Sequence, residues 1–71
     1  MSDQETISQP AQLALMSLAD HPHLDTARAI DSGPYGIQQI NAEEIENGLA
    51  ELAAMNPPRV VPKPGGGWRL P

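Results

Sequence analysis

The sequence has no cysteine and no phenylalanine, and its aromatic side chains are one tryptophan and one tyrosine. Without cysteine the chain forms neither a disulfide framework nor a thiolate metal site, which fits a reducing compartment. With so few aromatic residues, leucine, isoleucine and alanine must fill the core, and Trp68 is its largest single contributor. At 71 residues there is room for one small domain.

Long hydrophobic runs are also missing, since no stretch reaches the roughly 18 apolar residues that a membrane span requires. The first residues, Met1 to Thr6, lack the basic and apolar regions of a signal peptide. We therefore expect a soluble, cytoplasmic protein that does not bind a membrane. Residues 1–7 are mostly polar, and we expect a flexible N-terminal arm there, followed by a domain over residues 8–71.

Basic residues are few, with four against nine acids and a net charge of −5. Residues 1–51 hold all nine acids and Arg28, a balance of −8, whereas residues 52–71 hold three basic residues and no acid, a balance of +3. Such a split predicts two surfaces of opposite charge. No catalytic triad or carboxylate cleft can be assembled convincingly from so short a chain, so we expect no enzyme activity.

Apolar spacing predicts a first helix over about residues 10–20, which Ser8 or Gln9 can cap. Its expected core face holds Ala11, Leu15 and Leu18, flanked by Ala14. Leu13 and Met16 lie off that stripe. Two interpretations stay open: the helix is buried on two sides, or these residues form an apolar patch where a second copy of the chain docks.

A short second helix is predicted over about residues 25–32, with Asp25 as its cap and Gly33 as a left-handed glycine after its end. Leu24 and Ile30 must dock this helix onto the others, because two turns are not stable alone. The segment Tyr35 to Ile40 is either a turn or a short extended piece, with Ile37 and Ile40 pointing inward. A third strand that pairs with the terminal hairpin, in this segment or near Leu24, also stays open.

Between these helices lie His21 and His23, close to Asp20 and Asp25. Imidazoles and carboxylates are ligands that zinc and nickel accept. Their spacing matches no established metal motif, so we interpret them as solvated loop residues and predict neither a metal nor a cofactor.

A third helix is predicted over about residues 41–55, because Asn41 and Glu44 have the spacing of a capping box. Ile45, Leu49 and Leu52 form its core face. The opposite face holds Glu43, Glu46, Asn47, Ala50, Glu51 and Ala54. Gly48 lies beside the apolar stripe, which predicts close packing against another backbone. Asn56-Pro57-Pro58 ends the helix.

The last part of the chain predicts a β-hairpin over about residues 59–70, in which two short runs flank Gly65-Gly66-Gly67. The glycines predict a flexible tip rather than a phosphate loop, because no helix and lysine follow them. Trp68 alternates with Leu70, which favours a place in the core over an exposed stacking platform. Pro62 and Pro64 have no backbone amide donors, so two interpretations of the hairpin stay open: two paired strands or a loose arm.

Three helices followed by a glycine-tipped hairpin that ends Trp68-Arg69-Leu70 resemble the winged helix-turn-helix domains of small transcription regulators. The resemblance covers about residues 10–71 and implies an α+β fold, namely a three-helix winged helix-turn-helix with a C-terminal β-hairpin wing. It also implies that residues 41–55 are the recognition helix and that residues 63–67 are the wing tip. Members of this family commonly place the helix in the major groove and the wing against the DNA backbone.

Two functions therefore stay open, transcription regulation by DNA binding or docking of a basic protein partner. Contact with DNA would come mainly through the wing, using Arg59, Lys63, Gly65, Gly66 and Arg69. Contact with a basic partner would come through the third helix, using Glu43, Glu46, Asn47 and Glu51. Because affinity for DNA arises from cations that neutralise phosphates, the acidic helix is disfavoured in a groove. That helix face is either a binding surface or merely solvated.

Overall fold

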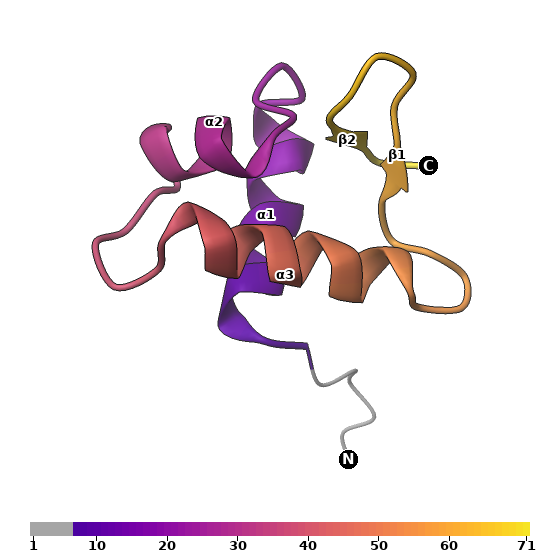
Figure 1. The fold of residues 1–71 in the computed structure, drawn as a ribbon, viewed down its shortest axis with the longest axis horizontal. Coiled ribbons are helices and arrows are strands. Elements are labelled where there is room, and N and C mark those ends of the chain that lie inside the picture. Colours follow the sequence, from indigo (N-terminus) through magenta and orange to yellow (C-terminus); the bar gives the residue numbers. More distant parts are fainter. Residues whose placement is uncertain (1–6) are drawn as a thin grey trace.

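The computed structural model describes residues 7–71 as three helices followed by a β-hairpin (Figure 1). The helices are α1 (Gln9–Asp20), α2 (Ala27–Ser32) and α3 (Ala42–Ala53), and the strands β1 (Val61–Pro62) and β2 (Trp68–Arg69) pair antiparallel. In Figure 1, α3 crosses α1, while α2 and the hairpin lie toward opposite ends of α3. The structure therefore confirms the α+β class and the predicted order of elements.

The predicted N-terminal arm falls largely outside the described residues, which begin at Ile7. Ile7 itself is half-buried and packs against the core. Among residues 7–71, no helix combines the length and the apolar character needed to cross a bilayer.

Helix α1 begins as predicted, and three of its four predicted core residues, Ala11, Ala14 and Leu18, are buried. The Ser8 hydroxyl accepts a hydrogen bond from the Ala11 amide at 3.3 Å, which makes Ser8 the cap. Leu13, expected off the core face, is buried, whereas Leu15 is half-buried and Met16 is 52% exposed. Helix α3 lies against the backbone of α1 at Ala11. The buried stripe consists of Ala11, Leu13, Ala14, Ser17 and Leu18.

Helix α2 is capped by Thr26 and not by the predicted Asp25, because the Thr26 hydroxyl accepts the Ala29 amide at 3.1 Å. The Asp25 side chain instead faces the hairpin. Gly33 is extended, with φ of −95°, so the expected left-handed conformation is wrong. Glycine is required at this position because of space, since a Cβ there would lie 2.6 Å from a methyl carbon of Leu24. Ile30 is fully buried and docks the helix as predicted.

The segment before α3 consists of turns and contains no strand. The Gly36 amide donates to the Gly33 carbonyl at 3.0 Å, and the Ile40 amide donates to the Ile37 carbonyl at 3.2 Å. Ile40 is buried as expected, but Ile37 is 40% exposed, which corrects the inward placement. A turn, unlike a helix, does not direct side chains three positions apart to the same side.

Helix α3 forms as the sequence predicts, except that it ends at Ala53, two residues early. Its capping box is complete, with the Glu44 amide 2.9 Å from Asn41 Oδ1 and the Asn41 amide 3.1 Å from Glu44 Oε1. A Cβ on Gly48 would lie 2.6 Å from the Ala11 nitrogen, so the predicted close backbone contact is confirmed. The fully buried core face consists of Ile45, Leu49 and Leu52.

The hairpin has two residues in each strand and pairs Val61 with Arg69 and Pro62 with Trp68. It is shorter than predicted because the prolines lack amide donors. Its glycine turn has positive φ at all three positions, Gly65, Gly66 and Gly67. No third strand forms among the described residues, but the Trp68 amide donates to the Asp25 carbonyl at 2.7 Å. That bond, together with the packing of the Trp68 side chain on the core, docks the hairpin onto the helices.

Candidate functional site

The outward side of α3 carries an exposed acidic face, which we define as Glu43, Glu46 and Asn47. The face points to solvent because the opposite side of the helix is fully buried in the core. Helix α3 contains no lysine or arginine. Within the part of the chain that the structure describes, neither Glu43 nor Glu46 has a hydrogen bond or an ion pair. Both carboxylates are therefore available to a partner.

Glu51, the fourth residue predicted for partner binding, has a structural role. Its two carboxylate oxygens accept the Ser8 amide at 3.0 Å and the Ser8 hydroxyl at 2.7 Å. Glu51 is half-buried as a result, and it ties the beginning of α1 to the last turn of α3. Its charge is satisfied within the chain, so the acidic face excludes it.

In the hairpin, Lys63 is also engaged within the chain. Its ammonium group forms an ion pair with the Asp25 carboxylate, and the two side chains are 34% and 25% exposed, respectively. The Lys63 hydrogen bond lowers the pKa of the Asp25 carboxyl below its ordinary value of 3.8. Gly67 lies so close that a Cβ on it would be 2.9 Å from the Asp25 carbonyl oxygen. Asp25 therefore holds the hairpin through both its carboxylate and its carbonyl.

The other residues predicted to contact nucleic acid differ in exposure. Arg69 is exposed, and so are Gly65 and Gly66, where an added Cβ would meet nothing within 4 Å. Arg59 is half-buried, and its backbone amide donates to the Leu52 carbonyl at 2.9 Å. The hairpin thus offers Arg69 and an open glycine tip, with Lys63 partly occupied by Asp25.

The loop after α1 gathers aromatic and acidic side chains. The Tyr35 hydroxyl donates a hydrogen bond to the Asp20 carboxylate, which raises the pKa of the Tyr35 hydroxyl above its ordinary value. The His21 ring makes edge contacts with Tyr35 and His23, each with 5.9 Å between ring centres. Among the described residues, no three histidine, aspartate or glutamate side chains gather in a way that could hold a metal ion.

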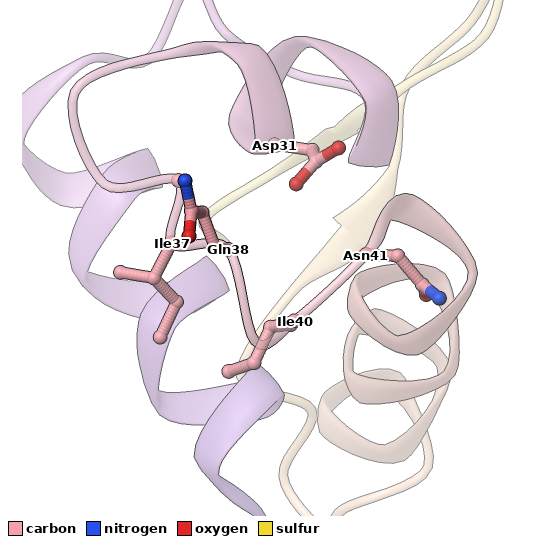
Figure 2. A pocket seen from close by; sticks show the side chains of 6 residues that line it. Asp31, Ile37, Gln38, Ile40 and Asn41 are labelled. Atoms are coloured by element: carbon pink, nitrogen blue, oxygen red, sulfur yellow. The ribbon is translucent and has the colours of Figure 1, made fainter.

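A cavity of about 330 Å³ lies between the end of α2 and the beginning of α3 (Figure 2). Its lining residues are Asp31, Gly36, Ile37, Gln38, Ile40 and Asn41. None of them was predicted as a site residue. The one available signal was the pair of isoleucines, Ile37 and Ile40, in an otherwise polar turn. From the sequence alone, both side chains are expected to point into the core, so this pair does not indicate a cavity.

Comparison with models of known protein families, with curated proteins and with solved structures finds no match to this chain.

Proposed function

We propose that this chain is a small winged helix-turn-helix domain without catalytic activity, which takes part in transcription regulation by docking a basic protein surface. The scaffold part of the proposal is supported by the order of elements, three helices and a glycine-tipped antiparallel hairpin. It is also supported by the hydrogen bond through which Trp68 joins the hairpin to the segment ahead of α2.

The acidic face of α3 is the observation that carries the functional part. In a winged helix-turn-helix domain this helix would be the one presented to a ligand. Here it offers two unpartnered carboxylates and no cation. A carboxylate about 4 Å from a phosphate is repelled by about 1 kcal/mol even in water, so groove insertion is disfavoured. The same carboxylates attract lysine and arginine side chains, which makes a basic protein surface the complementary partner.

A second candidate, DNA contact through the wing, is favoured by the exposure of Arg69 and of the glycine tip. With Lys63 bound to Asp25, few cations are free to neutralise phosphates, so such binding would be weak. Its affinity should fall with rising salt at a log-log slope of about 0.9 for each phosphate contacted.

An amide-shift titration tests both candidates. We expect a lysine-rich peptide to shift the amides of residues 42–47, and Glu43→Gln with Glu46→Gln to abolish these shifts. The matched control is Gln12→Lys with Ala19→Lys, which changes the net charge by the same amount at exposed positions of α1. If both double variants lost the amide shifts equally, the shifts would depend only on the net charge of the protein, and the proposal would be overturned.

Duplex DNA, added in a separate titration at low salt, addresses the wing. Shifts confined to the amides of residues 63–69 would support the second candidate, and Arg69→Ala should then remove them. A spectrum unchanged by DNA at low salt would eliminate DNA contact. Shifts of the α3 amides on DNA would contradict the assignment of the acidic face to a protein partner.

A further inference from the structure

The cavity between α2 and α3 is built by the turns that precede α3. Gly36 lies so close to the end of α2 that an added Cβ would collide with the Asp31 carbonyl. This close approach brings the chain back over α2 before it turns at residues 37–40 into the cap of α3. The result is a recess lined by one acidic side chain, two isoleucines and the amide side chains of Gln38 and Asn41 (Figure 2).

Asp31 supplies the charge of this cavity. Its side chain is half-buried, and it has no hydrogen bond or ion pair with any described side chain. It lies in the last turn of α2, where the negative end of a helix does not stabilise a carboxylate. In Figure 2 the carboxylate projects into the space between α2 and α3. Neither pairing nor helix stability accounts for this residue.

Two isoleucines supply the apolar part. Both line the recess; Ile40 is buried, and Ile37 has 40% of its surface exposed. Gln38, which is exposed, adds a side-chain amide to the lining. The recess therefore combines apolar surface, one unpaired negative charge and the amide group of Gln38, whereas the amide oxygen of Asn41 is engaged by the Glu44 amide.

We propose that this recess receives an arginine side chain of the basic partner, with the guanidinium on Asp31 and the methylene stem against Ile37 and Ile40. The inference rests on the proposed function, because it identifies which side chain the partner inserts. Long basic side chains bury their stems on apolar surface while the charged end keeps a polar contact. Arginine fits better than lysine, because its planar fork binds a carboxylate through two hydrogen bonds and has further donors for Gln38.

The recess and the acidic face are neighbours along the chain, because Asn41 lines the recess and also caps α3, two positions before Glu43 and five before Glu46. A single basic surface can therefore cover both. The net charge of −5 acts in the same direction and favours the approach of a cationic partner.

A pair of peptides tests the proposal directly. The probes are acetyl-Gly-Arg-Gly-amide and its citrulline counterpart, in which a neutral urea of nearly the same shape replaces the guanidinium. We expect the arginine peptide to shift the amides of residues 36–41 and to bind about tenfold more tightly than the citrulline peptide. Equal affinities for the two peptides, or shifts confined to other residues, would overturn the proposal.

Asp31→Asn completes a thermodynamic cycle with these peptides. We expect this variant to bind arginine and citrulline equally, because the charge contact is gone. A preference for arginine that survives in Asp31→Asn would show diffuse attraction to the acidic chain and would also overturn the proposal. Ile37→Ala, at an exposed position, should weaken both peptides equally and leave their ratio unchanged.

The two proposals fail separately. The acidic face is tested through Glu43 and Glu46 with a lysine-rich peptide, whereas the recess is tested through Asp31 and the arginine-to-citrulline ratio. If arginine and citrulline peptides bound equally while the lysine-rich peptide still shifted the amides of residues 42–47, only the proposal for the recess would be overturned.

Discussion

The helical body and the hairpin of this protein are held in place by different forces. In the body, α3 packs on α1 through fully buried aliphatic side chains and a backbone contact at Gly48. The hairpin has two-residue strands, and it docks through the half-buried Trp68 and two polar contacts to Asp25. Apolar burial involves no titrating group and is not weakened by charge screening, whereas an ion pair depends on both pH and ionic strength. We therefore expect the body to set the stability of the domain and the hairpin to respond to conditions.

In the folded chain, the acidic and basic parts of the sequence do not form two fully separate surfaces. One cation of the basic C-terminal part, Lys63, is bound by Asp25 of the acidic part. The split is thus partly neutralised inside the fold, on the hairpin side. On the α3 side nothing among the described residues neutralises Glu43 and Glu46, so the acidic surface is the one that remains available.

The largest effect is expected from Leu49→Ala, on the buried core face of α3. Leu49 is fully buried, and such truncations cost about 2–5 kcal/mol. A domain of this length has roughly 4–10 kcal/mol in total, so much of the folding free energy would be lost. Urea unfolding, followed by far-UV circular dichroism and by Trp68 fluorescence, measures the change.

Met16→Ala on α1 is the matched control, because that side chain is 52% exposed and should cost far less. If the two truncations had equal effects, the described core would be wrong. Separate midpoints for fluorescence and circular dichroism would mean that the hairpin opens independently of the body.

A smaller change in the free energy of unfolding is expected from Gly48→Ala, and its sign tests the close contact between α3 and α1. In an exposed helix this change would gain about 1 kcal/mol. Here the new Cβ would lie 2.6 Å from the Ala11 nitrogen and 2.8 Å from the Pro10 carbonyl carbon, so the helices must separate, at about 1–3 kcal/mol. Asn47→Ala, one position away on the exposed face, gives the reference for helix propensity alone. A stabilising Gly48→Ala would contradict the close contact.

The elements that the sequence predicted well are those with local signals. The capping box of α3, its buried stripe and the glycine turn of the hairpin all depend on residues within a few positions of one another. By contrast, the ion pair of Asp25 with Lys63 spans 38 positions and the bonds of Glu51 to Ser8 span 43. No pattern in the chain pairs these residues. For that reason Asp25 was predicted as a cap, and Glu51 and Lys63 were predicted as binding residues.

The cavity was missed for a related reason. It depends on the turn at residues 33–40, whose course follows from the tight packing of Gly36 on α2 and not from any periodicity. Likewise, the apolar spacing of α1 does not show that packing against the other helices buries Leu13 and leaves Leu15 half-buried. Tertiary packing decided these features, and a local pattern carries no information about them.

The smallest and most local effect is expected from Asp25→Asn, at the junction of the two regions. This variant loses the ion pair with Lys63 but keeps the backbone carbonyl that accepts the Trp68 amide. The hairpin should then open more often, so that the Trp68 amide exchanges faster with solvent while amides of α3 keep their protection. Hydrogen exchange followed by NMR resolves the two regions. Equal acceleration in both would mean that Asp25 stabilises the whole domain and not the hairpin in particular.

The same junction should give the hairpin a pH dependence that the body lacks. The pKa of the Asp25 carboxyl is lowered in the folded chain, so the contribution of the ion pair is complete above the ordinary value of 3.8. It is lost as the pH falls through the lower, folded value, where Asp25 takes up a proton and releases Lys63. The exchange rate of the Trp68 amide, corrected for intrinsic exchange, should therefore rise relative to that of α3 amides on acidification. In Asp25→Asn this relative rise should be absent, and if it persisted, another acid would have to hold the hairpin.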